Sequence, residues 1–169
     1  MNVLCTGNSS KRKFIPIFES LLSFFNNFSN HTLYLDEYID LEEFKKYQNK
    51  DSIYKPKNSI DFILCVGGDG AILSAIRRMS GYQLPILGIH IGKLGFLNKM
   101  NSNNYIRLLK QILKSKKFKY DNKSLIKSSF QSTDSQNIDL IAFNEIFISR
   151  TEVSRLLPVE VFINDELLN

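Results

Sequence analysis

Hydrophobic positions in the first part of the chain follow two alternating patterns, short continuous runs and helically spaced stripes. Continuous runs are typical of strands buried on both faces, as in a parallel sheet covered by helices. Stripes at helical spacing predict amphipathic helices, and the first stripe is rich in phenylalanine. We predict strands at 2–6, 32–35, 61–66 and 84–89, and helices at 14–28, 38–48, 71–79 and 105–112. This alternation implies a mostly parallel sheet with right-handed crossovers.

Beyond residue 116 the helical periodicity disappears. Strand-like runs follow at 125–131, 140–149 and 157–163, with a polar turn at 132–137. We therefore predict the α/β class with two parts. Residues 1–116 would form a Rossmann-like, nucleotide-binding parallel sheet flanked by helices, and residues 117–169 would begin a second, β-rich domain.

The composition is that of a folded protein. The 169 residues suffice for one good-sized domain, or for one domain and part of another. Hydrophobic residues make up 43% of the chain and charged residues 23%, which argues against disorder. The net charge of +5 suits an anionic ligand such as a nucleotide, although solvated lysines usually cause such an excess. No known nucleic-acid-binding motif accompanies the basic residues between 107 and 127, so we expect no nucleic-acid partner.

The cysteines and the N-terminus bear on the compartment. Cys5 and Cys65 lie in strand-like runs, which favours buried thiols in a reducing environment over a disulfide. No cluster of cysteine and histidine suggests a bound metal ion. The first residues lack the basic region of a signal peptide, and no apolar run approaches the length of a membrane span. We expect a cytoplasmic protein without membrane contact.

The segment Gly67–Gly70 carries the first candidate chemistry. It follows the most apolar run of the chain and precedes a helical stripe, which is where α/β folds bind phosphate. Glycines there permit positive φ and a close approach of the ligand. Asp69 is unusual, because a carboxylate repels phosphate unless a metal intervenes or the carboxylate has its own chemistry. The spacing matches neither a P-loop nor a dinucleotide fingerprint, and an ordinary tight turn is the alternative reading.

A second glycine-rich segment, Gly88–Leu97, follows the next strand. Because the carboxyl ends of parallel strands meet at one edge, both glycine segments should face the same crevice. Phe96 could offer a stacking surface for a ring, or it could fill the core. For His90 we expect a packed or hydrogen-bonded side chain rather than a metal ligand or a base.

A polar pair, Asn144 and Glu145, interrupts the apolar run expected to form the strand at 140–149. Polar groups in a buried strand need partners, which a neighbouring backbone or a polar ligand could supply. An amide and a carboxylate together suit ribose hydroxyls or an adenine edge. Arg150 and Arg155 lie just beyond and could meet phosphates or solvent.

In their order along the chain, the two glycine segments and the Asn144–Glu145 pair resemble the bacterial ATP-NAD kinase family. Diacylglycerol kinases and phosphofructokinases of the same superfamily share the first segment, but not the Leu-Gly-Phe-Leu loop followed by an Asn-Glu strand. The resemblance implies transfer of the γ-phosphoryl group of ATP, or of polyphosphate, to the 2′-hydroxyl of the adenosine ribose of NAD. It also implies Mg²⁺ or another divalent metal, and a homo-oligomer for a full-length protein.

The resemblance further implies roles for single residues. Asp69 would take or orient the proton of the 2′-hydroxyl, and Gly68 and Gly70 would lie against phosphate or ribose. The remaining four residues would all contact substrate. Asn144 and Glu145 would hold its ribose and diphosphate region, Phe96 would lie near the adenine, and Arg155 would contact substrate.

The sequence departs from the family pattern at three points. Ala71 stands where relatives usually have Thr or Asn, and His90 stands where Asn is common. Relatives also continue past the segment around Asp165, so the chain resembles a C-terminally truncated member. Two alternatives therefore stay open, a non-catalytic nucleotide-binding fragment and a lipid or sugar kinase of the same superfamily.

Overall fold

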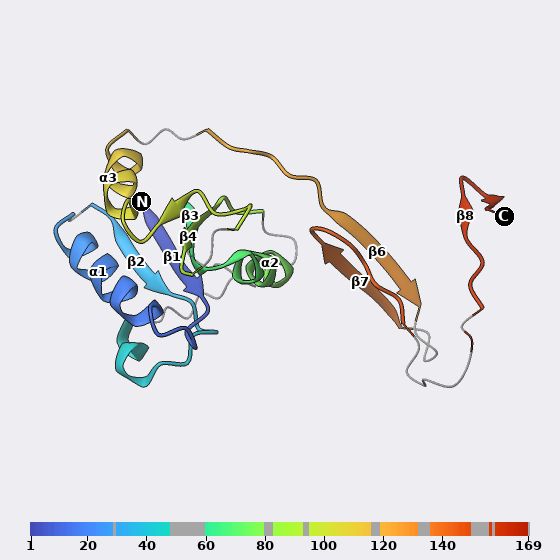
Figure 1. Ribbon diagram of the computed structural model, residues 1–169, viewed down its shortest axis with the longest axis horizontal. Helices are drawn as coiled ribbons and strands as arrows, with labels where there is room; N and C mark the ends of the chain where they lie inside the picture. Colours follow the sequence, from blue (N-terminus) through green and yellow to red (C-terminus); the bar gives the residue numbers. More distant parts are fainter. Residues whose placement is uncertain are drawn as a thin grey trace.

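A five-stranded, fully parallel sheet forms the centre of the N-terminal part (Figure 1). The structure is a computed structural model that describes residues 1–28, 30–47, 60–79, 83–92, 95–115, 119–131, 136–149, 156 and 158–168. The strands lie in the order β2-β1-β3-β4-β5, so the direction of winding reverses between β1 and β3. Their bounds are β1 Asn2–Gly7, β2 Thr32–Leu35, β3 Phe62–Gly67, β4 Ile86–His90 and β5 Met100–Asn101.

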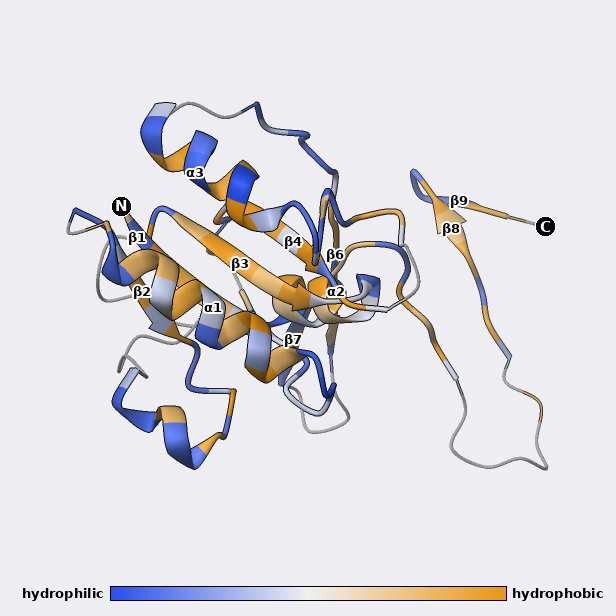
Figure 2. Cartoon of the chain, turned by 60° about the vertical axis from the view of Figure 1, so that its left-hand side comes forward, coloured by the Kyte–Doolittle hydropathy of each residue, from blue (hydrophilic) through white to orange (hydrophobic). Residues whose placement is uncertain are grey.

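Helices cover both faces of this sheet. α1 (Phe14–Asn26) and α3 (Tyr105–Ser115) share one apolar cluster with the sheet, and α2 (Asp69–Arg78) packs in a second cluster on the other face. Figure 2 shows the hydrophobic β3 between α1 and α3. The phenylalanine stripe of α1 is core packing: Phe18 is fully buried and meets the ring of Phe44 edge-on at 5.1 Å between centroids.

A buried polar cluster joins α2 to β1 and to the residue that follows the edge strand β2. Arg78, in the last turn of α2, forms an ion pair with Asp36, which follows β2. Thr6 of β1 donates to Asp36 Oδ2 at 2.6 Å and accepts from Arg78 Nη2 at 2.8 Å. The Arg78 guanidinium also lies 4.2 Å from the ring centre of Tyr38. These contacts fix the C-terminal end of α2 against the sheet.

Antiparallel strands follow α3. β6 (Ile126–Gln131) and β7 (Asn137–Ala142) form a hairpin that extends away from the parallel sheet, beyond α2 (Figure 1). A second, shorter hairpin pairs β8 (Phe162–Ile163) with β9 (Glu166–Leu167) through Asn164 and Asp165, which have φ of 51° and 67°. Such positive values are typical of tight hairpin turns.

The predicted fold class is confirmed: a parallel sheet flanked by helices precedes antiparallel strands. The boundary between two domains at residues 116 and 117 stays a prediction. The helix expected at 38–48 is instead a short 3-10 helix, η1 (Glu42–Tyr47). Turns occupy the preceding residues, where Ile39 N donates to Asp36 O at 2.9 Å and Leu41 N donates to Ile39 O at 3.1 Å. Within the described residues, the helices are too short or too polar to cross a bilayer.

Candidate functional site

The two glycine segments adjoin at the carboxyl ends of β3 and β4. Gly67 and His90 are opposite each other in the strand pair, and Ile91 N donates to Gly67 O at 3.3 Å. The neighbouring β1 ends at the same edge, where Asn8 N donates to Val66 O at 3.0 Å. This edge includes the point between β1 and β3 where the strand order reverses, which is where open α/β sheets bind ligands.

Asp69 connects the two segments directly. It is the first residue of α2 and is half-buried. Its Oδ2 accepts a hydrogen bond from Phe96 N at 2.7 Å, and its Oδ1 accepts from Leu97 N at 3.2 Å and from Asn98 Nδ2 at 3.0 Å. The two glycine segments therefore meet at one edge of the sheet, and the carboxylate lies between them rather than in the core. That both segments face one crevice stays a prediction.

The glycines around Asp69 serve different purposes. A Cβ on Gly95 would collide with the Asp69 carboxylate, and a Cβ on Gly88 would collide with the Asn98 amide. A Cβ on Gly68 or Gly70 would meet nothing within 4 Å. The first pair therefore makes room for protein atoms, whereas the second pair borders open space.

The conformational reason that the sequence suggested for these glycines is wrong. Among the described glycines, positive φ occurs only at Gly7 (151°) and Gly92 (111°). Gly68 caps α2 with φ of −93° and ψ of −170°, an extended conformation that any residue can adopt. The absence of a side chain at Gly68 is thus not required by its backbone, which leaves close approach of a ligand as the reason that we propose.

The side chains of Phe96 and His90 differ in their exposure to solvent. The Phe96 side chain is 98% exposed, so it does not fill the core, and its ring is free to contact a ligand. The His90 side chain is buried as expected, with 5% exposure, and neither ring nitrogen has a hydrogen-bond partner within the described part of the chain.

The Asn144–Glu145 pair does not lie within a strand, so that expectation is wrong. β7 ends at Ala142, which pairs with Ile126, the first residue of β6. No partner residue continues the ladder, and both Asn144 and Glu145 are exposed. β7 itself approaches α2 (Figure 1), so the pair follows a strand close to the helix that Asp69 begins. Arg150 and Arg155 lie outside the described residues.

Sequence reasoning missed Asn98. Its side chain is 8% exposed, its Nδ2 donates to Asp69, and its Oδ1 has no partner among the described residues. The contact spans 29 positions, which no local pattern reveals. The only signal in the sequence was the position of Asn98 close to the apolar residues Leu97 and Met100, because an amide that is buried with such neighbours needs a hydrogen-bond partner.

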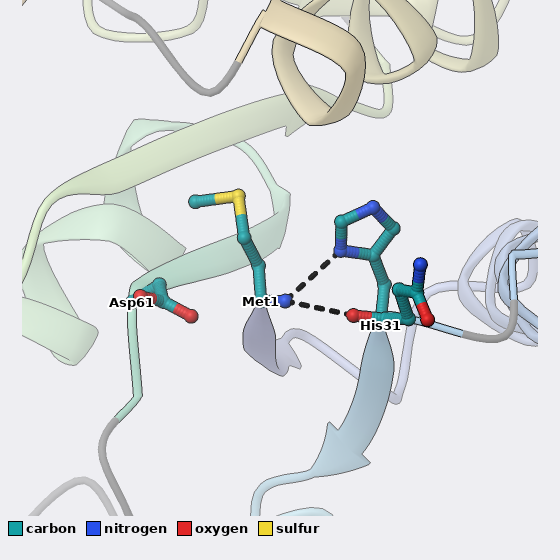
Figure 3. Close-up of a pocket in the computed structure, with 4 residues that line it drawn as sticks. Met1, His31 and Asp61 are labelled. Atoms are coloured by element: carbon teal, nitrogen blue, oxygen red, sulfur yellow. Dashed lines mark hydrogen bonds between the residues drawn. The ribbon is translucent and has the colours of Figure 1, made fainter.

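Two other features bear on the location of the site. No three His, Cys, Asp or Glu side chains in the described part of the chain are arranged to hold a metal ion. A hollow of about 400 Å³ lies at the amino ends of the strands, bordered by Met1, Asn30, His31 and Asp61 (Figure 3). There the Met1 amine donates to Asn30 O at 3.1 Å and lies 2.9 Å from His31 Nδ1. This hollow is at the opposite edge from Asp69, so we assign it no part in the site.

Comparison with known protein families identifies the family to which this chain belongs. The family described as the ATP-NAD kinase N-terminal domain matches residues 21–118, which include both glycine segments. The chain belongs to the ATP-NAD kinase family. An NAD kinase of Sulfurimonas denitrificans is 31% identical over 118 residues, which cover 70% of this chain and 41% of that protein. An NAD kinase of Flavobacterium johnsoniae is 27% identical over 175 residues, which cover 100% of this chain and 59% of that protein.

A solved structure agrees with this ATP-NAD kinase fold. The crystal structure of yeast NADH kinase complexed with NADH superposes with a TM-score of 0.75 at 20% identity. It covers 100% of this chain, which in turn covers 54% of the yeast protein. The chain thus spans between 41% and 59% of the length of these three proteins.

Proposed function

We propose that this chain carries the phosphoryl-transfer site of an NAD kinase. The reaction would transfer the γ-phosphoryl group of ATP to the 2′-hydroxyl of the adenosine ribose of NAD, giving NADP and ADP. The observation that carries the proposal is the half-buried Asp69 carboxylate, held between two glycine segments at the carboxyl edge of the sheet. Membership of the ATP-NAD kinase family supports the same reaction.

Asp69 is suited to act on a hydroxyl group. A carboxylate offers about four lone-pair positions, and the three N–H donors from the 96–98 loop leave one for a substrate. The 2′-hydroxyl oxygen would attack the γ-phosphorus while its proton passes to Asp69, and the bond to the bridging oxygen would break with ADP as the leaving group. Phosphoryl transfer needs positioning more than a strong base, which a fixed carboxylate provides.

The surrounding residues would position the two nucleotides. Gly68 and Gly70 border open space at the start of α2, so phosphate or ribose can approach the backbone there. Phe96 would contact the adenine ring, since its own ring is exposed. Asn144 and Glu145, exposed beyond β7, would hold the ribose and diphosphate of NAD, and Arg155 would contact substrate.

The divalent metal of this reaction would arrive with ATP. The described residues do not fit a resident Mg²⁺ site, because Asp69 already accepts three N–H groups and no other acidic cluster is present among them. Mg²⁺ usually keeps several waters and binds through substrate phosphates. We therefore treat MgATP as the substrate and assign no step to a metal held by the protein.

The decisive test is the Asp69→Asn variant. We expect it to lose NADP formation from NAD and ATP while its circular dichroism spectrum stays unchanged, because Asp69 lies at the start of a helix rather than in the core. Near-normal turnover would remove Asp69 from the mechanism. Parallel assays with diacylglycerol and ATP, and with ATP alone, test the lipid-kinase alternative and background hydrolysis.

A non-catalytic nucleotide-binding fragment is the second candidate. This chain aligns over 100% of its length with 59% of the Flavobacterium protein, so turnover by these residues needs its own test. Calorimetric titration with ATP and NAD separates the two. Binding without turnover would identify the fragment, and turnover would identify the kinase.

A further inference from the structure

The two oxygens of the Asp69 carboxylate have unequal partners. Oδ1 accepts two hydrogen bonds, from Leu97 N at 3.2 Å and from Asn98 Nδ2 at 3.0 Å. Oδ2 accepts one, from Phe96 N at 2.7 Å. Each carboxylate oxygen has about two lone-pair positions, so Oδ1 is saturated and the free position is on Oδ2.

Asn98 is the side chain that makes this difference. Without its amide, each carboxylate oxygen would accept one backbone N–H, and the group could present either oxygen to a ligand. The amide can take only one orientation, because its oxygen would be repelled by the carboxylate if the group were flipped. Gly88 permits this placement, since any Cβ there would collide with Asn98.

We propose that Asn98 is a positioning residue that saturates Oδ1 and thereby makes Oδ2 the proton acceptor for the substrate hydroxyl. Through the same carboxylate it holds the Gly95–Asn98 loop, which carries Phe96, against the start of α2. The catalytic consequence rests on the proposed function, whereas the hold on the loop does not. One buried amide therefore determines both which oxygen of Asp69 accepts the proton and where the loop with the exposed Phe96 ring lies.

The test compares Asn98→Leu, which keeps the size and removes the donor, with Asn98→Asp, which keeps the shape and adds a negative charge beside Oδ1. We expect kcat for NAD phosphorylation to fall roughly 10- to 100-fold in Asn98→Leu with little change in KM, because the acceptor is misplaced while the binding groups remain. Asn98→Asp should lose more, because two adjacent carboxylates repel each other. Asn103→Leu, an exposed asparagine in the turn before α3, is the matched control and should behave as wild type.

A second readout needs no turnover. Amide hydrogen exchange at Phe96 and Leu97 should be slow in the wild-type chain and markedly faster in Asn98→Leu, because a carboxylate free to rotate holds these N–H groups less well. The Asn98 side-chain amide resonance should shift in Asp69→Asn, which retains the backbone. Thermal unfolding of each variant identifies any general loss of the fold.

The outcomes separate this inference from the proposed function. Unchanged exchange at Phe96 and Leu97 in a folded Asn98→Leu protein overturns the role of Asn98, whatever the activity. Unchanged kcat in that variant, or a change in KM alone, overturns its positioning role in the reaction. A wild-type chain without NAD phosphorylation but with the expected exchange pattern overturns the proposed function and retains the hold of Asn98 on the loop.

Discussion

At the scale of single residues, the glycines near Asp69 are of two kinds. Gly88 and Gly95 lack side chains because protein atoms, the Asn98 amide and the Asp69 carboxylate, occupy that space. Gly68 and Gly70 lack side chains although nothing in the fold fills the space. The first kind should matter for the geometry of the site, and the second for the ligand.

This distinction gives a direct prediction for two alanine substitutions. Gly95→Ala should displace Asp69 and reduce turnover, since its methyl group collides with the carboxylate. Gly68→Ala should keep the stability within about 1 kcal/mol and weaken nucleotide binding, since the methyl group enters the space left for the ligand. Thermal unfolding and calorimetric titration measure both effects. Normal affinity in Gly68→Ala would show that no ligand approaches the backbone there.

Residue roles were only partly predictable from the sequence. Asp69 and Phe96 stood out because a carboxylate and an aromatic ring are unexpected among glycines, and the structure leaves both at the sheet edge. Asn98 and Arg78 did not stand out, since their partners lie 29 and 42 positions away in sequence. Local patterns reveal which residue types are unusual, but not which distant side chain will meet them.

At the scale of elements, the hydrophobic pattern located the strands and helices of the parallel sheet. β2 has the predicted bounds, because its short run is limited by polar residues on both sides. The pattern failed at 140–149, where apolar residues continue past Ala142 but the partner strand does not. Phe147 is 84% exposed as a result. A strand requires a neighbour, and the apolar run alone could not supply one.

The polar cluster under α2 predicts a strong effect of Arg78 on stability. Replacing Arg78 with Met leaves Asp36 buried without its cation, and such losses cost about 3–5 kcal/mol. Lys45→Ala, which removes an exposed ion pair with Glu42, is the matched control and should not change stability measurably. Urea denaturation of both variants provides the comparison. Equal stability of Arg78→Met and wild type would mean that packing alone holds α2 in place.

The cysteines of β1 and β3 predict a chemical readout of folding. Cys5 and Cys65 are buried and free, and burial raises the pKa of the Cys65 thiol from 9.0 to about 12. Iodoacetamide, which reacts with thiolates, should therefore leave both cysteines unmodified in the native chain and modify both in urea. Because the unfolded chain loses this proton first, stability should fall as pH rises from about 9 toward 12. Labelling under native conditions at neutral pH would contradict this burial.

At the scale of the whole molecule, exposed apolar side chains are concentrated from Leu125 onward, in and around the antiparallel strands. Among the described residues, every exposed large hydrophobic except Tyr38, Phe96 and Tyr120 lies at or beyond Leu125. The pairing of β6 with β7 gives this hairpin two faces of different polarity. On one face, which also carries Ile141, Lys127 and Ser129 bind Asp139. The other face is mainly apolar and comprises Ile126, Ser128, Phe130, Ile138, Leu140 and Ala142.

An uncovered apolar strand face predicts self-association of this chain. Phe130→Lys places a charge on that face and should reduce light scattering and dye binding. Gln131→Lys adds the same charge to the opposite face and should leave both unchanged. Equal scattering by the two variants would show that the apolar face does not drive association.

The joint at Asp69 has a thermodynamic consequence. It closes loops of 27 to 29 residues, and the entropy lost in closing them is offset only when β3 and β4 are already paired. A nucleotide that touches both glycine segments would bind the assembled state alone. Such a nucleotide should therefore raise the melting temperature in proportion to the logarithm of its concentration. Calorimetry can detect this increase without any phosphoryl transfer.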